Sequence, residues 1–115
     1  MTQPTVVDVH HHSLPIGFIE QVRREGSRYG FRLEETDPGK FLKITSSDGR
    51  TVGISDQGWD REVRGREMDR AGIDLGLQSV IPGMMCYGSG ETQVEWASRG
   101  INDALGAEMQ ARPDR

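Results

Sequence analysis

The stretch Val6-Val7-Asp8-Val9-His10-His11-His12-Ser13-Leu14-Pro15 is a short β-type run that contains all three histidines of the chain. Side chains alternate between the faces of a strand, so Asp8, His10 and His12 are expected on one face and His11 on the other. Two imidazoles on one face can both reach a single divalent cation. The run alone leaves a fortuitous polar cluster as an alternative. A purification tag is disfavoured, because the histidines are few and the flanking residues look native.

The next segments change from helical to strand periodicity. Residues 16–25 predict a short helix with Ile16, Ile19 and Val22 as its apolar stripe and Gly26 as its C-terminal glycine. Residues 31–34, 41–44 and 51–54 then predict three short strands. The sequences Asp37-Pro38-Gly39 and Ser47-Asp48-Gly49 between them are turn signals, so an antiparallel meander is expected.

The second half returns to helix, strand and helix. Asp60 is expected to cap a helix that ends at Ala71, before Gly72. Residues 75–81 predict a parallel strand buried on both faces, ended by Pro82-Gly83. Ser89 is the expected N-cap of the last helix. An apolar stripe at helical spacing supports that helix and consists of Val94, Ala97, Ile101, Ala104 and Leu105.

Three segments resemble one family. The run 6–15 resembles the opening of the amidohydrolase superfamily, where an H-x-H on the first barrel strand supplies two metal ligands. Residues 59–74, WDREVRGREMDRAGID, resemble the W-D-x-E-x-R-x-x-x-M-D-x-x-G segment of the aminocarboxymuconate-semialdehyde decarboxylase-like branch. Residues 100–105 and 112–115 are similar to the I-N-D-x-L and P-D-R-F motifs of that branch. Together, and in family order, these segments cover nearly the whole chain.

The resemblance implies an α/β fold: the N-terminal part of a (β/α)8 barrel with a small antiparallel β insertion, not closed within this chain. It implies one partial domain, 1–115, with the first barrel strand at 5–12, the insertion at 29–55, and helix, strand and helix at 59–115. Such barrels run to about 250 residues or more. The chain is therefore expected to be an N-terminal portion that does not turn over substrate alone.

For the site, the resemblance implies that His10 and His12 hold a divalent metal, with Zn²⁺ the expected ion, and that His11 is structural. Asp8 is either a partner that orients a ligand imidazole or a solvated strand aspartate. The expected reaction is non-oxidative decarboxylation of a small unsaturated or aromatic carboxylic acid. The alternatives are a metal-dependent hydrolase of the same superfamily, or a truncated non-catalytic module that needs a partner chain.

Substrate-binding candidates are Arg50, Met84 and Tyr87. Family members grip a substrate carboxylate with a hairpin arginine; its position falls on Val52 here, and Arg50 is the nearest basic residue. Met84 and Tyr87 belong to the loop after the second predicted barrel strand, the end at which barrel active sites form. Three other residues that could attract attention are expected to be structural or solvated: Cys86 packs in the fold, Trp59 anchors the insertion, and Arg64 is a solvated helix residue.

Composition limits the classes of partner that the chain is expected to bind. The net charge of −4 and the absence of a basic stripe disfavour nucleic-acid and anionic-membrane binding. No apolar run approaches the ~20 residues of a membrane span. Residues 1–8 lack the pattern of a secretory signal, and the single Cys86 favours a reducing cytoplasm. A separate C-terminal chain or a homo-oligomer remains a possible partner.

Overall fold

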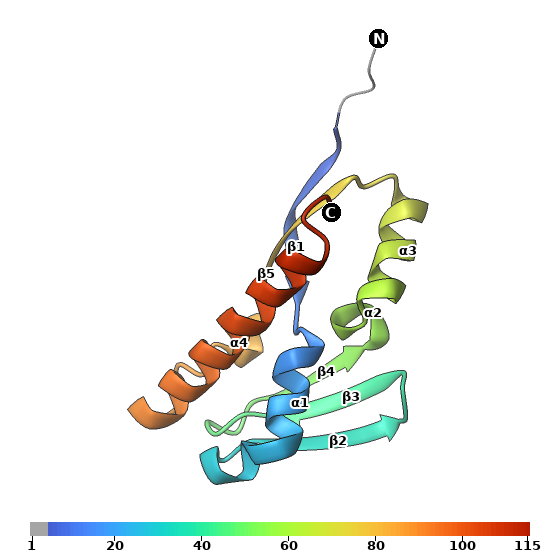
Figure 1. Cartoon of the computed structure of the whole chain (residues 1–115). Helices are drawn as coiled ribbons and strands as arrows, with labels where there is room; N and C mark the ends of the chain where they lie inside the picture. Colours follow the sequence, from blue (N-terminus) through green and yellow to red (C-terminus); the bar gives the residue numbers. More distant parts are fainter. Residues whose placement is uncertain (1–4) are drawn as a thin grey trace.

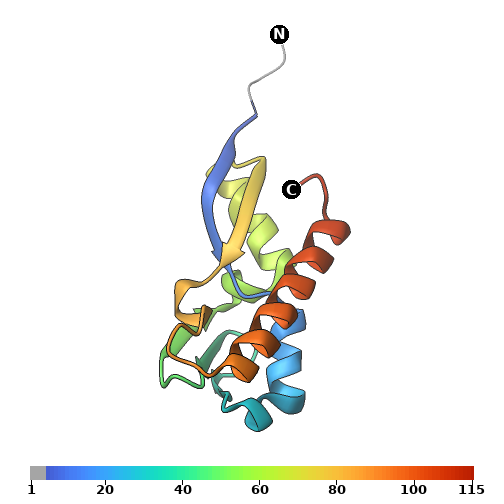
Figure 2. The same ribbon diagram turned by 90° about the vertical axis from the view of Figure 1, so that its left-hand side faces the viewer.

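The computed structural model describes residues 5–115, which form two separate β-sheets with helices around them (Figure 1). One sheet is a parallel pair, β1–β5, and the other is an antiparallel meander in the order β2-β3-β4. Both views show β1 and β5 side by side (Figure 2). The elements run in the order β1 Val7–Ser13, α1 Ile16–Glu25, η1 Gly26–Tyr29, β2 Arg32–Asp37, β3 Phe41–Thr45, β4 Thr51–Ser55, α2 Asp56–Trp59, α3 Arg61–Ala71, β5 Leu75–Val80, η2 Pro82–Met84 and α4 Glu91–Ala111.

The predicted meander is confirmed. Strands β3 and β4 extend the expected segments by one residue each, whereas β2 begins one residue later than expected and runs three residues further, to Asp37. Both turn glycines have the left-handed backbone that the turn signals predicted, with φ +78° at Gly39 and φ +85° at Gly49. The sequence placed this sheet correctly because each turn is a local device that needs no distant partner.

The hydrophobic core lies between the meander and the helices α1 and α4. The inner face of the sheet contributes Leu42, Ile44 and Ile54, each at most 3% exposed. Phe18 of α1 is fully buried and packs edge-on to Phe31. The stripe predicted for α4 is confirmed, with Ala97, Ile101 and Ala104 buried and Val94 and Leu105 packed partly against the core. The meander that the sequence describes as an insertion is thus one wall of the core.

The stripe predicted for α1 is partly wrong. Ile19 and Val22 are buried as expected, but Ile16 is 39% exposed and Phe18 takes its place in the core. The helix α1 begins directly after the buried Pro15, and its first residue, Ile16, lies at the edge of the packed face. A larger aromatic side chain was available two residues later to fill the space.

The parallel pairing of β1 with β5 is confirmed, and the barrel is not closed in the part of the chain described. The expectation that strand 75–81 is buried on both faces is wrong, since Leu77 is 52% exposed. On the neighbouring strand, Val9 is 76% exposed. Burial on both faces requires a layer on each side, and within residues 5–115 this pair has no further strand beside it.

Two helix ends differ from their predictions. Gly26 has a right-handed backbone and continues from α1 into η1, and the left-handed glycine is Gly30 with φ +79°. A Cβ at Gly26 would lie 2.9 Å from Val22 Cγ1, so close packing explains this glycine. The N-cap of α4 is Gly90, because the hydroxyl of Ser89 is bonded to that of Ser47 instead of capping the helix.

The helix α3 begins as predicted. Asp60 Oδ1 accepts hydrogen bonds from the backbone N–H groups of Glu62 (2.9 Å) and Val63 (3.2 Å). Gly72 ends the helix with φ +68°. These two signals therefore fix both ends of a helix whose buried stripe is weak in the sequence.

Within residues 5–115, no helix is both long enough and apolar enough to cross a lipid bilayer. The expectation that residues 1–8 carry no secretory signal falls partly on residues 1–4, which lie outside the described residues. The assignment of the chain to one domain, 1–115, likewise stays a prediction.

Candidate metal centre

The side chains of His10 and His12 converge on one face of β1. Their Nε2 atoms lie 2.8 Å apart, and the ring centroids are separated by 4.6 Å at an interplanar angle of 81°. Both residues are exposed, whereas His11 is directed to the other face with only 12% of its side chain exposed. The predicted division of the three histidines between two faces is confirmed. Metal binding itself stays a prediction.

Ser79 supports the pair from the neighbouring strand. Its hydroxyl lies 3.0 Å from Nδ1 of His12, and the two residues are register partners in the parallel pair β1–β5. This contact fixes the orientation of the His12 ring and leaves Nε2 as the atom that faces His10. Sequence reasoning missed Ser79, because finding it requires the register between strands 67 residues apart.

Asp8 does not share the face of His10 and His12, so that prediction is wrong. The register of β1 against β5 shifts between Asp8 and His11, which interrupts the simple alternation of side chains. Asp8 Oδ2 lies 3.0 Å from Nδ1 of His11, and Oδ1 accepts the backbone N–H of His10 at 3.0 Å. The hydrogen bond from the backbone of His10, followed by the one from the His11 ring, lowers the pKa of Asp8. Asp8 therefore orients the backbone around the site and the structural histidine.

His11 has a packing role. Its ring covers Gly76 of β5, where a Cβ would lie 2.9 Å from the imidazole Nδ1. A residue with a side chain at position 76 would displace the ring. The expectation that His11 is structural agrees with this contact.

The imidazole nitrogens of His10 and His12 suit two of the four ligand positions of a tetrahedral zinc site. Zinc binds imidazole nitrogens at about 2.0–2.1 Å, so two ligands of a tetrahedral site stand about 3.3 Å apart. The Nε2 atoms at 2.8 Å are close to this spacing and would need to open by roughly half an ångström. Among residues 5–115, no group of three or more His, Cys, Asp or Glu side chains is placed to hold a metal ion. The described residues thus offer two imidazoles whose Nε2 atoms already point at one another.

The substrate candidates lie on different loops. Arg50 follows the β3–β4 turn with its side chain 67% exposed and its Nε 3.9 Å from Asp48 Oδ2. Tyr87 is 81% exposed in the loop before α4. Asp48 joins these two loops by accepting the backbone N–H of Gly88 at 3.3 Å. Met84 is only 1% exposed and belongs to the core, so it can shape a wall but its side chain is not at the surface.

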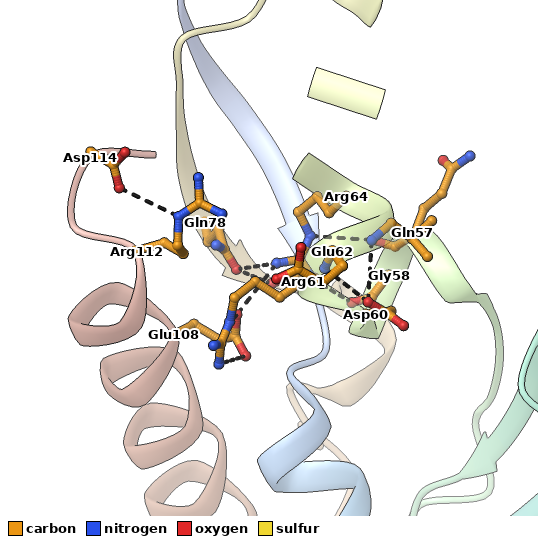
Figure 3. Close-up of polar contacts among 12 residues, drawn as sticks. Gln57, Gly58, Asp60, Arg61, Glu62, Arg64, Gln78, Glu108, Arg112 and Asp114 are labelled. Atoms are coloured by element: carbon orange, nitrogen blue, oxygen red, sulfur yellow. Dashed lines mark hydrogen bonds and ion pairs between the residues drawn. The ribbon is translucent and has the colours of Figure 1, made fainter. Parts of the chain in front are cut away.

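Two further expectations concern residues of the W-D-x-E-x-R segment. Trp59 is 6% exposed and packs in the core, as an anchor should. Arg64 is not a solvated helix residue: only 5% of it is exposed. Its guanidinium donates to the carbonyl oxygens of Gln57 (3.2 Å) and Gly58 (3.1 Å) and to Gln78 Oε1 (3.1 Å), as Figure 3 shows. The solvated interpretation fails because the acceptors come from two separate parts of the chain, α2 and β5, which only the fold brings to Arg64.

A buried carboxylate completes this cluster. Glu108 of α4 is 4% exposed and accepts two hydrogen bonds from Arg61, at 3.0 and 3.2 Å, while Arg64 Nη1 lies 4.0 Å away (Figure 3). The hydrogen bond to Glu108 raises the pKa of Arg61. Desolvation lowers the pKa of Arg64 despite the attraction of Glu108. Sequence reasoning did not find Glu108 or this cluster, because the buried stripe predicted for α4 consists of apolar residues and ends before residue 108.

Comparison with known proteins confirms the resemblance seen in the motifs. The chain is 30% identical over 110 residues to a 2-amino-3-carboxymuconate-6-semialdehyde decarboxylase of Caenorhabditis elegans. The match includes 95% of this chain but only 27% of the length of that relative. No family model matches the chain.

Proposed function

We propose that this chain, a homologue of the aminocarboxymuconate-semialdehyde decarboxylase-like branch of the amidohydrolase superfamily, supplies the first metal-binding strand of a carboxy-lyase site. The observation that carries the proposal is the convergence of His10 and His12, whose Nε2 atoms lie 2.8 Å apart. The hydrogen bond between Ser79 and His12 supports it, because metal-ligating imidazoles characteristically have such a partner on the other ring nitrogen.

A bound divalent ion, with Zn²⁺ the expected one, supplies a Lewis acid that polarises a substrate or water oxygen. In this proposal, His10 and His12 are the ligands that hold the ion. Ser79 is the group that keeps the His12 ring in place. The proposed substrate is a small unsaturated or aromatic carboxylic acid, by analogy with the relative's name. The proposed compartment is the cytoplasm.

On the substrate side, Arg50 is proposed to meet the carboxylate. Its guanidinium is largely exposed and is held only loosely by Asp48, so it is free to form a charge-assisted pair. Tyr87 is proposed as a further contact from the adjoining loop, and Met84 as part of the apolar wall beneath it.

The site needs more than this chain provides. A catalytic zinc has three protein ligands and an open position, and the described residues bring only two imidazoles together. Because the chain corresponds to 27% of its relative, we place the remaining ligands and the proton-transfer group in the part not covered here. That part is either a continuation of this polypeptide, a separate C-terminal chain or another copy in a homo-oligomer.

Metal titration tests the ligand assignment. Cobalt(II) replaces zinc in such sites and absorbs visible light, so binding is measured by absorbance and by calorimetry. In the protein completed with the C-terminal portion, His10→Ala and His12→Ala should abolish cobalt binding, and His11→Ala is the matched control that should retain it. Equal loss from all three variants would contradict the assignment, as would failure of the completed protein to bind cobalt.

Turnover tests the reaction. Purified residues 1–115 loaded with Zn²⁺ should release no CO₂ from 2-amino-3-carboxymuconate-6-semialdehyde or from hydroxybenzoate-type acids. Addition of the C-terminal portion should produce release that depends on His10 and His12. Hydrolysis without CO₂ release would favour the hydrolase alternative. Metal binding with no turnover in any combination would favour a non-catalytic module. Robust turnover by residues 1–115 alone would show that the site is built differently.

A further inference from the structure

The register between β1 and β5 decides whether His12 contacts Ser79. The backbone hydrogen bonds between the two strands do not fix this register alone, because the pairing is irregular. The pairing shifts between Asp8 and His11, so the segment that carries the histidines is separated from the regular pairing of Val7 and Asp8. Slippage by one residue would transfer each side chain of a strand to the opposite face. Some other contact must therefore hold residues 11–13 in place.

A hydrogen-bonded junction lies on the face opposite His12. Gln78 Oε1 accepts hydrogen bonds from Ser13 Oγ at 2.8 Å and from Arg64 Nη1 at 3.1 Å. Ser13 directly follows His12, and Gln78 directly precedes Ser79. Neighbouring residues of a strand point to opposite faces, so the junction sits immediately behind the contact between His12 and Ser79.

The same guanidinium also secures the end of β1. Gly58 O accepts Arg64 Nη2 at 3.1 Å and the backbone N–H of Leu14 at 2.9 Å. Arg64 thus reaches β1 by two routes: through the side chain of Gln78 and through the carbonyl of Gly58. Arg64 is only 5% exposed and Ser13 is fully buried, which limits the access of water to their ends of these hydrogen bonds, while Gln78 is half-buried.

We propose that Arg64 is a positioning residue for the histidine pair, acting through Gln78 and Gly58 to set the register that brings His12 onto Ser79. Figure 3 shows the guanidinium directed at Gln78 on one side and at Gln57 and Gly58 on the other. The metal-related part of this inference rests on the proposed function, whereas the register part does not.

The decisive variant is Gln78→Leu, which removes the oxygen shared by Ser13 and Arg64 at similar volume. Gln78→Glu keeps an acceptor oxygen for both and is the conservative rescue. Arg64→Lys keeps the charge but, with a single nitrogen, cannot donate to Gln78 and to the carbonyl oxygens of Gln57 and Gly58 at once. Arg61→Ala is the matched control, because Arg61 bonds to Glu108 and not to Gln78. Urea unfolding of each variant identifies conditions under which it is fully folded.

Two readouts are taken under those conditions. In NMR spectra, Gln78→Leu and Arg64→Lys should lose the cross-strand contact between His12 and Ser79 and shift the ring signals of His10 and His12. Gln78→Glu and Arg61→Ala should keep both features. In the protein completed with the C-terminal portion, cobalt(II) affinity should fall about 10–100-fold in the first two variants and stay within about threefold in the other two.

The inference is overturned if folded Gln78→Leu keeps the His12–Ser79 contact and unshifted ring signals. It is also overturned if Arg61→Ala perturbs them as strongly, since the effect would then be general destabilisation. Should the protein completed with the C-terminal portion bind no cobalt, the proposed function fails. The NMR comparison would still decide whether Arg64 sets the register.

Discussion

Ser79 Oγ lies 3.0 Å from Nδ1 of His12, across the only pair of parallel strands among residues 5–115. The contact joins residues 67 positions apart and ties one ring nitrogen of His12 to β5. The other ring nitrogen is left 2.8 Å from His10. The direction of the His12 Nε2 atom is thus set by a contact from the neighbouring strand.

In the protein completed with the C-terminal portion, Ser79→Ala should therefore weaken cobalt(II) binding by about 10–100-fold, because the His12 ring loses the partner that fixes its orientation. Stability should change little, since the residue is exposed. Calorimetric titration measures the affinity. Ser98→Ala, at an exposed position of α4, is the matched control. Unchanged affinity in Ser79→Ala would show that the hydroxyl plays no part in orienting the ligand.

The cap of α3 gives a second prediction. Asp60→Ala should lower the free energy of unfolding by about 1 kcal/mol, because the N–H groups of Glu62 and Val63 lose their acceptor. Asp60→Asn keeps an acceptor oxygen and should cost far less. Urea denaturation of the two variants makes the comparison. Equal losses would mean that the negative charge, not the hydrogen bonds, stabilises the helix start.

These two residues show what the sequence could and could not predict. Asp60, Gly39, Gly49 and Gly72 act within a few residues of their own position, so spacing alone located the turns and the helix ends. The alternation of a strand was enough to separate His11 from His10 and His12.

Other features depended on distant contacts and were missed or misplaced. Asp8 was assigned to the wrong face, because a shift in pairing register leaves no signature in one strand alone. Arg64 was taken as solvated, because its partners on α2, β5 and α4 are brought to it only by the fold. The burial of β5 was overestimated. Apolar residues show that a strand can be buried, but burial also requires a layer of other elements that covers the strand.

The buried ion cluster yields a third prediction. Glu108→Ala should lower the free energy of unfolding by about 3–5 kcal/mol, because Arg64 would remain buried without a carboxylate nearby. Arg61→Ala should cost less, since Glu108 keeps Arg64 at 4.0 Å and the Arg61 side chain is already 39% exposed. Chemical denaturation ranks the two variants. The reverse ranking would show that Arg61, not Arg64, is the essential counter-ion of Glu108.

Asp48 gives a prediction about acid stability. The hydroxyl of Ser46, and then the backbone N–H groups of Arg50 and Gly88, lower the pKa of Asp48 below its ordinary value of 3.8. A carboxyl with a lowered folded-state pKa stabilises the fold above its unfolded pKa and loses that contribution as the pH falls through its folded pKa. Asp48→Asn should therefore lower Tm at pH 7 and flatten the fall of Tm below pH 3.8. Parallel Tm curves for the two proteins in acid would contradict this linkage.

Cys86 provides a prediction about reactivity. The thiol is 2% exposed, and its Sγ donates a hydrogen bond to the carbonyl oxygen of Met84 at 3.2 Å. Burial, with a smaller contribution from the charge of Asp48, raises the pKa of Cys86 and suppresses the reactive thiolate.

A disulfide reagent should therefore label Cys86 in the folded chain at least ~100-fold more slowly than in urea, because labelling has to wait for local opening. Absorbance of the released thiol measures both rates. The unfolded chain is the internal control, since it contains the same single cysteine. Asp48→Asn should speed labelling, because it removes a nearby negative charge and loosens the loop through Gly88. Rapid stoichiometric labelling of the folded chain would mean that the loop after β5 opens freely, and Cys86 would then have to be considered as a reactive group.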